Sequence, residues 1–233
     1  MSVSHISPDS PGGSPLRQPK RSVLADDVYE IIREGLLSLR IAPDSHLNIE
    51  KLAKELHVSN TPVRQALARL EAEGLVSKEP FRGFAASRLL DSRTIAELYE
   101  YRLLIEPSNA AHAAQRRSEA EAAELESLCA EGAITDLVAG APAGTELGRR
   151  DVDFHCGIAR QAGNSVIVDN LGPIMARMSL YSLYDRHGVG EEAWQEHRAI
   201  ASAIRAADPN AAAAAMRAHL GNGLDRMRRA FGH

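Results

Sequence analysis

A short helix with an uninterrupted apolar stripe constrains the fold of this chain more than any other feature of its sequence. It lies in the stretch HVSNTPVRQALARLEAEGLV, residues 57–76, where Ser59 is suited to cap the first turn and Pro62 falls inside that turn without losing a hydrogen bond. Apolar residues then recur with i, i+3, i+4, i+7 spacing at Val63, Ala66, Leu67 and Leu70. This spacing predicts a helix that buries one side against other elements.

The other side of the predicted helix is small and polar. It carries Asn60, Thr61, Arg64, Gln65 and Ala68. Arginine can pair with guanine or phosphate, and asparagine or glutamine with adenine, when a helix lies in the major groove of DNA. An ordinary solvated helix face has a similar composition, so the neighbouring segments must decide between the two interpretations.

The segments on either side favour DNA binding. Upstream, LADDVYEIIREGLLSL and LNIEKLAKEL have helical apolar spacing, the second with Asn48 as its cap, and only His57 and Val58 separate it from the next helix. Downstream, LVSKEPFRGFAAS predicts strand, turn and strand, with Pro80 and Gly83 as turn residues. Three helices followed by a two-stranded hairpin predict a winged helix-turn-helix.

The charge of this region suits a polyanionic partner. Residues 57–88 contain five basic and three acidic side chains, although the whole chain has a formal net charge of −4. The predicted wing tip adds Arg82 beside Gly83, where the backbone can approach a phosphate closely. Because phosphate contacts supply much of the affinity for DNA, even this small local surplus favours binding.

The residues quoted above resemble the DNA-binding region of the GntR family of bacterial transcription regulators. The segment LNIEKLAKELHVSNTPVRQALARLEAEGLV follows that family's usual L-x-E-x-x-L-A-x-x-L-x-V-S-R-T-P-V-R-E-A-L-x-x-L-E-x-E-G-L-V in register. The resemblance implies that Thr61, Arg64 and Gly83 bind operator DNA. Asn60 stands where the family has an operator-binding arginine, and Gln65 where it has glutamate, so we expect an operator of altered sequence.

Length, cysteine content and the start of the chain set further bounds. The 233 residues allow one large or two modest domains. No run of about 18 apolar residues that would span a membrane is present. Residues 1–20 are rich in Ser, Pro and Gly without the apolar core of a signal peptide, so we expect a disordered tail. Two cysteines, Cys129 and Cys156, make no disulfide framework and suit the reducing cytoplasm.

From residue 91 onward the sequence predicts helices. Aromatic residues make up only 4% of the chain, which favours helices over a β-sandwich or barrel. We expect Ser92 to cap the first of these helices, Pro173 to kink or divide a later one, and Pro209 to begin the last. The predicted fold is therefore mainly α. It comprises a tail at 1–20, a winged helix-turn-helix at 21–89 and an all-helical bundle of six or seven helices at 90–233.

Four potential metal ligands lie in the predicted bundle. Asp151 and His155 are four residues apart, which places both on one helix face. His197 and His219 follow on the last two helices, among apolar neighbours. Taken singly, each has an ordinary interpretation as a solvated acid or a core histidine. Three imidazoles and one carboxylate projecting inward from three helices would suit Zn²⁺, Ni²⁺ or another borderline transition metal.

The same helices resemble the FCD effector domain of the FadR-type branch of GntR regulators. The similar segments are LYEYRLLIEPSNAAHAA, DVDFHCGIARQAGN and EHRAIASAIRAADPNAAAAAMRAHL. Many members with this domain bind a divalent metal through an aspartate and three histidines. The resemblance carries that role to Asp151, His155, His197 and His219, with zinc as the expected metal and nickel or manganese as alternatives.

The resemblance also implies a site for a ligand carboxylate. It assigns ligand binding to Arg102, for which an ion pair with Glu106 inside the bundle is the alternative. It assigns the same role to Asn164, for which a helix-ending role is the alternative.

These features predict a cytoplasmic, homodimeric transcription regulator that binds double-stranded operator DNA, most simply as a repressor, and responds to a small organic acid at the metal. One alternative is a metal-dependent enzyme, since an open coordination position can activate water, but no general base stands out. Others are a regulator of the same fold whose metal is structural or absent, and a sensor of fatty-acyl ligands without metal. We therefore expect neither enzymatic activity nor a membrane partner.

Overall fold

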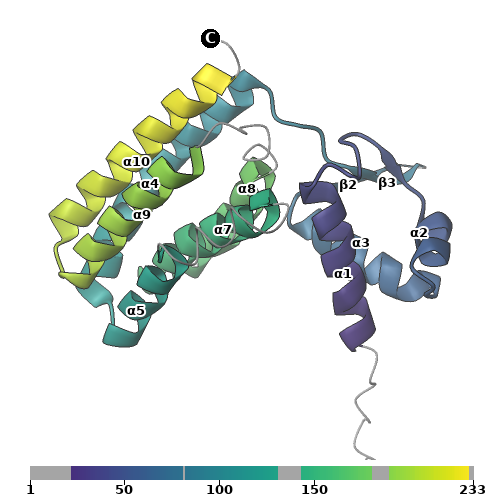
Figure 1. The fold of residues 1–233 in the computed structure, drawn as a ribbon, viewed down its shortest axis with the longest axis horizontal. Helices are drawn as coiled ribbons and strands as arrows, with labels where there is room; N and C mark the ends of the chain where they lie inside the picture. The colour runs from purple at the N-terminus through teal and green to yellow at the C-terminus, as the bar shows by residue number, and fades with distance from the viewer. Residues whose placement is uncertain (1–21, 81, 131–142, 180–188, 231–233) are drawn as a thin grey trace, which may run out of the picture.

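The computed structural model describes residues 22–80, 82–130, 143–179 and 189–230. Within these ranges the chain forms nine helices and one three-stranded sheet, which confirms the mainly α fold predicted from the sequence. Figure 1 shows the three N-terminal helices and the sheet on one side and the helical bundle on the other. The predicted tail at 1–20 and the wing residue Phe81 lie outside the described residues. None of the helices in these ranges is both long and apolar enough to cross a membrane.

The N-terminal part is a winged helix-turn-helix. Its elements are α1 (Ser22–Leu37), β1 (His46–Leu47), α2 (Ile49–Glu55), α3 (Asn60–Ala72), β2 (Val76–Glu79) and β3 (Gly83–Ala86). The apolar stripe of α3 packs against α1 and is completely buried. The spacing of these residues predicted this burial, and it leaves the polar side of α3 in solvent.

β1 is a strand that the sequence did not predict. It pairs antiparallel with β3, His46 opposite Ala85 and Leu47 opposite Phe84, so β3 lies in the middle of the sheet. A strand of two residues carries no alternating pattern, so only its pairing identifies it. Its consequence is that His46 lies beside the wing.

Helix starts agree with the sequence-based expectation at α2 but differ in detail at α3 and α4. The side chain of Asn48 accepts a hydrogen bond from Lys51 N at 2.9 Å, as expected of the α2 cap. Ser59 occupies the cap position of α3, but its hydroxyl makes no capping bond. The expectation that Ser92 caps α4 is wrong, because the carboxylate of the preceding Asp91 accepts from a first-turn amide at 2.7 Å. Asp and Ser are comparably good caps, so the backbone geometry decides which of the two begins the helix.

The C-terminal part is a helical bundle. Its six described helices, within the predicted range of six or seven, are α4 (Ser92–Arg116), α5 (Glu119–Leu128), α7 (Ala143–Gln161), α8 (Ser165–Ser179), α9 (Val189–Arg205) and α10 (Pro209–Ala230). α10 lies along α4 and α9 (Figure 1). Gly223 permits this close approach, because a Cβ there would lie 2.8 Å from the Tyr99 hydroxyl. Pro209 begins α10, as expected.

α8 joins the two parts of the molecule. Pro173 lies inside α8 without dividing it, since the neighbouring Leu171 and Met175 are buried and their packing offsets the lost backbone hydrogen bond. On the bundle side, these two residues pack with Ala159 of α7. On the other side, Ala176 is buried in the apolar cluster formed by α1, α3 and the sheet. α8 therefore contributes to two hydrophobic cores.

Candidate functional site

The polar side of α3 is the first candidate site. Its members Asn60, Thr61, Arg64, Gln65 and Ala68 are all exposed. Among the described residues, no ion pair or side-chain hydrogen bond engages Arg64. Arg69 differs, because it pairs with Asp26 at 2.6 Å and stacks over the Tyr29 ring at 3.9 Å. Of these two arginines, only Arg64 therefore remains available for a partner.

The wing, the turn between β2 and β3, carries the other predicted DNA-binding residues, Arg82 and Gly83. Arg82 is exposed and within 3.8 Å of Glu79 across the turn. His46 Nε2 contacts the backbone carbonyl of Arg82, which ties β1 to the wing. Gly83 has φ +88°, a left-handed conformation that favours glycine, although a Cβ there would find ordinary space. The backbone conformation, rather than a lack of space, accounts for the glycine.

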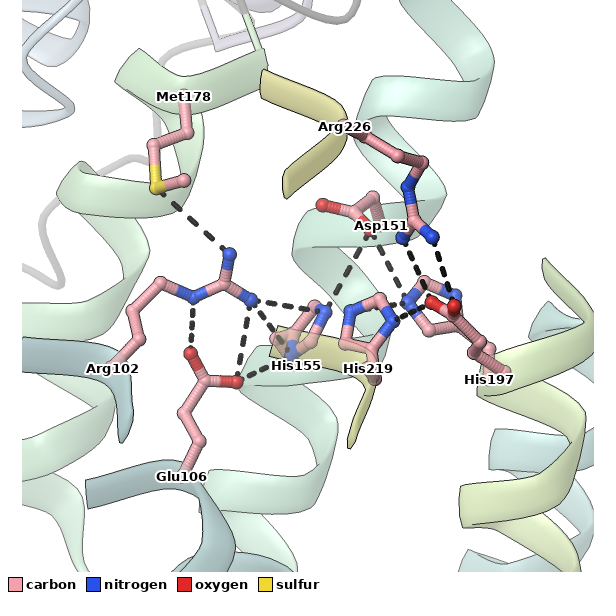
Figure 2. Close-up of polar contacts among 9 residues, drawn as sticks. Arg102, Glu106, Asp151, His155, Met178, His197, His219 and Arg226 are labelled. Atoms are coloured by element: carbon pink, nitrogen blue, oxygen red, sulfur yellow. Dashed lines mark hydrogen bonds and ion pairs between the residues drawn. The ribbon is translucent and has the colours of Figure 1, made fainter. Parts of the chain in front are cut away.

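Three buried histidines from different helices form the second candidate site. α7 supplies His155, α9 supplies His197 and α10 supplies His219, and their potential ligand atoms all lie within 4.8 Å of one another (Figure 2). The Nε2 atoms of His197 and His219 are 3.3 Å apart. Two nitrogens that share one metal at about 2.1 Å are separated by roughly 3.0–3.4 Å. This spacing therefore fits two ligands of a single ion.

Asp151 joins the histidines, as the sequence predicted. It lies one turn before His155 on α7, and its Oδ1 atom is 3.7 Å from His155 Nε2 and 3.4 Å from His197 Nε2. Its side chain is 35% exposed, whereas the histidines are almost completely buried. The three imidazoles thus lie together, and Asp151 borders two of them, His155 and His197, on the more exposed side.

The state of the imidazoles suits a metal. Burial, followed by the nearby histidines, holds the pKa of His197 well below its usual value. Burial also lowers the pKa of His219, although the hydrogen bond with Glu196 opposes the shift. A neutral imidazole offers a lone pair to a cation, and the Nε2 atom of His197 is the one that faces Asp151 and His219. Nitrogen donors with one carboxylate match borderline divalent metals.

Arg102 lies next to the histidines. Its guanidinium forms a buried ion pair with Glu106, and its Nη2 atom also lies 3.2 Å from His155 Nε2. Glu106 Oε2 lies 2.5 Å from His155 Nδ1. Burial alone would raise the pKa of Glu106, but Arg102 and His155 outweigh it and hold that pKa below its usual range. The Arg102–Glu106 ion pair, which the sequence analysis gave as the alternative role of Arg102, therefore forms. The same arginine also borders the candidate metal position.

Several contributors to this site were not identified from the sequence. Glu196 accepts hydrogen bonds from His219 and Arg226, all at 2.8 Å. His197 lies between two aromatic rings, stacked on Phe154 at 4.3 Å and edge-on to Trp194 at 4.7 Å. Trp194 precedes His197 by three residues, so helical spacing could have placed both on one face. Nothing in the sequence pairs Glu196 with residues of another helix.

Asn164 lies at the start of α8. Its side-chain oxygen accepts from Ile167 N at 3.2 Å, and the residue is exposed. Among the described residues, no contact joins it to the histidines. The structure thus gives Asn164 a capping role at a helix start, and Gly163 before it, with φ +79°, follows the end of α7.

Comparison with known proteins assigns both parts of the chain. The model of bacterial regulatory proteins of the gntR family matches residues 24–85, and the FCD domain model matches residues 97–222. The Nta operon transcriptional regulator of Aminobacter aminovorans is 30% identical over 163 residues, covering 70% of this chain and 71% of that regulator. The galactonate operon transcriptional repressor of Escherichia coli is 25% identical, covering 80% and 89%. These relatives are named as transcription regulators, not as enzymes.

A solved structure shows the same fold. Escherichia coli McbR/YncC superposes with a TM-score of 0.70 at 19% identity, covering 89% of this chain and 98% of that one. The FCD match alone spans more than half of the chain, and it lies C-terminal to the gntR match. The chain therefore belongs to the GntR family of DNA-binding transcription regulators and carries an FCD effector domain.

Proposed function

We propose that this regulator binds its operator under the control of a small carboxylate held at a divalent metal. The convergence of Asp151, His155, His197 and His219, with Arg102 beside them, is the observation that carries the proposal. Residues 90–233 would form the effector domain. Zinc is the metal we expect first, with nickel or manganese as alternatives.

Two sets of side chains would hold the effector: the metal ligands and Arg102. The three imidazoles and Asp151 would hold the ion, which would supply positive charge and an open coordination position for the carboxylate. Arg102 presents a second cation, and planar guanidinium groups bind carboxylates in a bidentate manner. Glu106 keeps this arginine charged and in place. The galactonate operon repressor, a relative, is named after an operon for a sugar acid, which agrees with a carboxylate effector.

Residues 21–89 would bind DNA. Asn60, Thr61, Arg64 and Gln65 project from α3 into solvent and would contact base edges, while Arg82 and Gly83 would approach phosphates. One recognition helix covers too few base pairs for high specificity, so we propose a homodimer on a two-fold operator. Binding to double-stranded operator DNA would place the protein in the cytoplasm, and repression is the simplest outcome.

α8 would connect the effector to the DNA. Met178 Sδ lies 3.9 Å from Arg102 Nη1, so the end of α8 borders the arginine that would bind the carboxylate. Ala176, two residues earlier, lies in the N-terminal core. A ligand shifts an equilibrium only when it binds two arrangements with different affinity. Movement of Arg102 toward a carboxylate would provide that difference through α8.

Metal analysis and DNA-binding measurements test this function. Protein purified with zinc supplied and without chelator should contain metal, and His219→Ala should lose it. A DNA site selected from randomised duplexes should bind the wild-type protein with an affinity that galactonate, L-lactate or succinate changes in anisotropy titrations. His219→Ala should still bind this site but lose the acid response.

The exposed His112 on α4 provides the control, since His112→Ala should keep both the metal and the response. Metal-free wild-type protein, together with an acid response that survives His219→Ala, would contradict the proposed effector site.

A further inference from the structure

Glu196 connects more groups of the histidine site than any other carboxylate in the described contacts. Its Oε1 atom accepts hydrogen bonds from Asn222 Nδ2 and Arg226 Nη1, each at 2.8 Å. Its Oε2 atom accepts from Arg226 Nη2 and contacts His219 Nδ1, again at 2.8 Å. The carboxylate thus joins α9 to three side chains of α10. Arg226 and His219 are both labelled in Figure 2.

These contacts determine where the proton of His219 lies. Both oxygens of Glu196 face the guanidinium of Arg226 in a bidentate ion pair, which is the arrangement of a carboxylate, and Asn222 also donates to it. An ionised carboxylate only accepts hydrogen bonds. Nδ1 of His219 must therefore carry the proton, and Nε2 carries the lone pair. That lone pair lies on the side of His197 Nε2, 3.3 Å away.

The other two histidines have partners other than Glu196. Glu106 contacts His155 Nδ1 at 2.5 Å and is itself paired with Arg102, so an Arg–Glu pair orients this ring as well. Within the described ranges, His197 Nδ1 has no hydrogen-bond partner, and the ring lies between those of Phe154 and Trp194. Glu196 and Glu106 therefore act on different histidines, and each can serve as the control for the other.

We propose that Glu196, held by Arg226, is a positioning residue that fixes His219 with Nδ1 protonated and Nε2 directed at the metal position. This inference rests on the proposed metal site. Carboxylates that hold the distal nitrogen of a ligating histidine raise metal affinity by about ten- to a hundred-fold. We expect an effect of this size from Glu196.

Glu196→Gln keeps the size of the side chain but replaces one acceptor oxygen with an NH₂ donor, so it tests the positioning role alone. Glutamine has one oxygen, and Arg226 offers only donors to it, so the amide NH₂ group should turn toward His219 Nδ1. His219 should then shift its proton to Nε2, and zinc affinity should fall about ten- to a hundred-fold in competition with a chromogenic chelator. Glu196→Asp keeps the acceptor and should retain tighter zinc binding than Glu196→Gln. In the metal-free protein, ¹⁵N-imidazole NMR reports which nitrogen of each histidine is protonated.

Two controls make the result specific. Glu106→Gln should change the ¹⁵N signature of His155 and leave that of His219 unchanged. Glu119→Gln breaks an ion pair with Arg205 on α9, away from the histidines, and should change neither zinc affinity nor tautomers. A variant that only destabilises α9 would lower the melting temperature without moving the His219 proton.

The possible failures are distinguishable. Wild-type protein that binds no zinc contradicts the proposed metal site itself. Wild-type protein that binds zinc, but whose His219 carries its proton on Nε2 without metal, overturns the positioning role even if Glu196→Gln does not fold. Zinc affinity of Glu196→Gln within twofold of wild type, with an unchanged His219 signal, overturns it as well.

Discussion

Cys129 is almost completely buried at the end of α5, and its chemistry follows from that burial. Burial raises the pKa of its thiol to about 11, well above that of a free cysteine. Only the thiolate reacts with alkylating agents, and each pKa unit changes its population about tenfold below the pKa. At pH 8 ionisation alone should make the native thiol react about a hundred-fold more slowly than the unfolded chain.

Iodoacetamide labelling mapped by mass spectrometry checks this expectation. Labelling of native Cys129 should rise about tenfold per pH unit from pH 7 to 9, because the pKa lies above this range, whereas urea-unfolded protein should level off near pH 9. Equal rates in the native and unfolded protein would show that Cys129 is not buried as described.

Single residues differ in how well the sequence predicted them. The burial of Val63, Ala66 and Leu67 follows from helical spacing, which any amphipathic helix obeys. The resemblance to the FCD domain assigned Asp151 and the histidines, and the structure brings them together. Glu196 and Phe154 were not predicted, since their roles depend on partners in other helices, and residue spacing carries no information about those partners.

At the scale of elements, α3 presents two arginines in different states. Arg64 is exposed and makes no ion pair within the described ranges, whereas Arg69 pairs with Asp26 and stacks on Tyr29. Arg64→Ala should therefore weaken operator binding by about 1–3 kcal/mol if it contacts a base. Arg69→Ala should leave operator affinity nearly unchanged and act on thermal stability instead.

Anisotropy titrations with the selected DNA site and thermal melts measure the two effects separately. A larger loss of DNA affinity in Arg69→Ala than in Arg64→Ala would mean that α3 presents another face to the groove.

The sequence predicted long amphipathic helices better than short strands and helix starts, for physical reasons. Long amphipathic helices such as α1 and α3 repeat their pattern over several turns, so their existence was clear from the sequence. β1 is a two-residue strand, and its pairing with β3 depends on how the chain folds back. The start of α4 was misplaced by one residue, because Asp91 and Ser92 are both capable caps and only the backbone geometry decides between them.

For the whole molecule, α8 is an element that packs into both the bundle and the winged helix-turn-helix. Ala176 is 6% exposed within the N-terminal core, whereas Val166 on the same helix is 67% exposed. Ala176→Glu should bury a charge and lower the free energy of unfolding by about 1–3 kcal/mol or more. It should also reduce the effect of the acid on operator affinity, because α8 would no longer pack between the two parts.

Val166→Glu introduces the same side chain at an exposed site and should change stability by no more than about 0.5 kcal/mol. Thermal melts and operator titrations with and without the acid compare the two variants. Equal acid responses in wild type and in a folded Ala176→Glu variant would exclude α8 as the connection.

The position of α8 also bears on how such regulators can be divided and recombined. A fragment ending at residue 89 would keep its own three helices and sheet but lose the Ala176 methyl from its core and the Arg177 side chain that covers Gly74. A chimaera joined within residues 87–91, between β3 and α4, would lack the same contacts unless the incoming effector domain supplies a residue that matches Ala176. Exchange of effector domains between relatives is therefore constrained by complementarity at this helix, as well as by linker length.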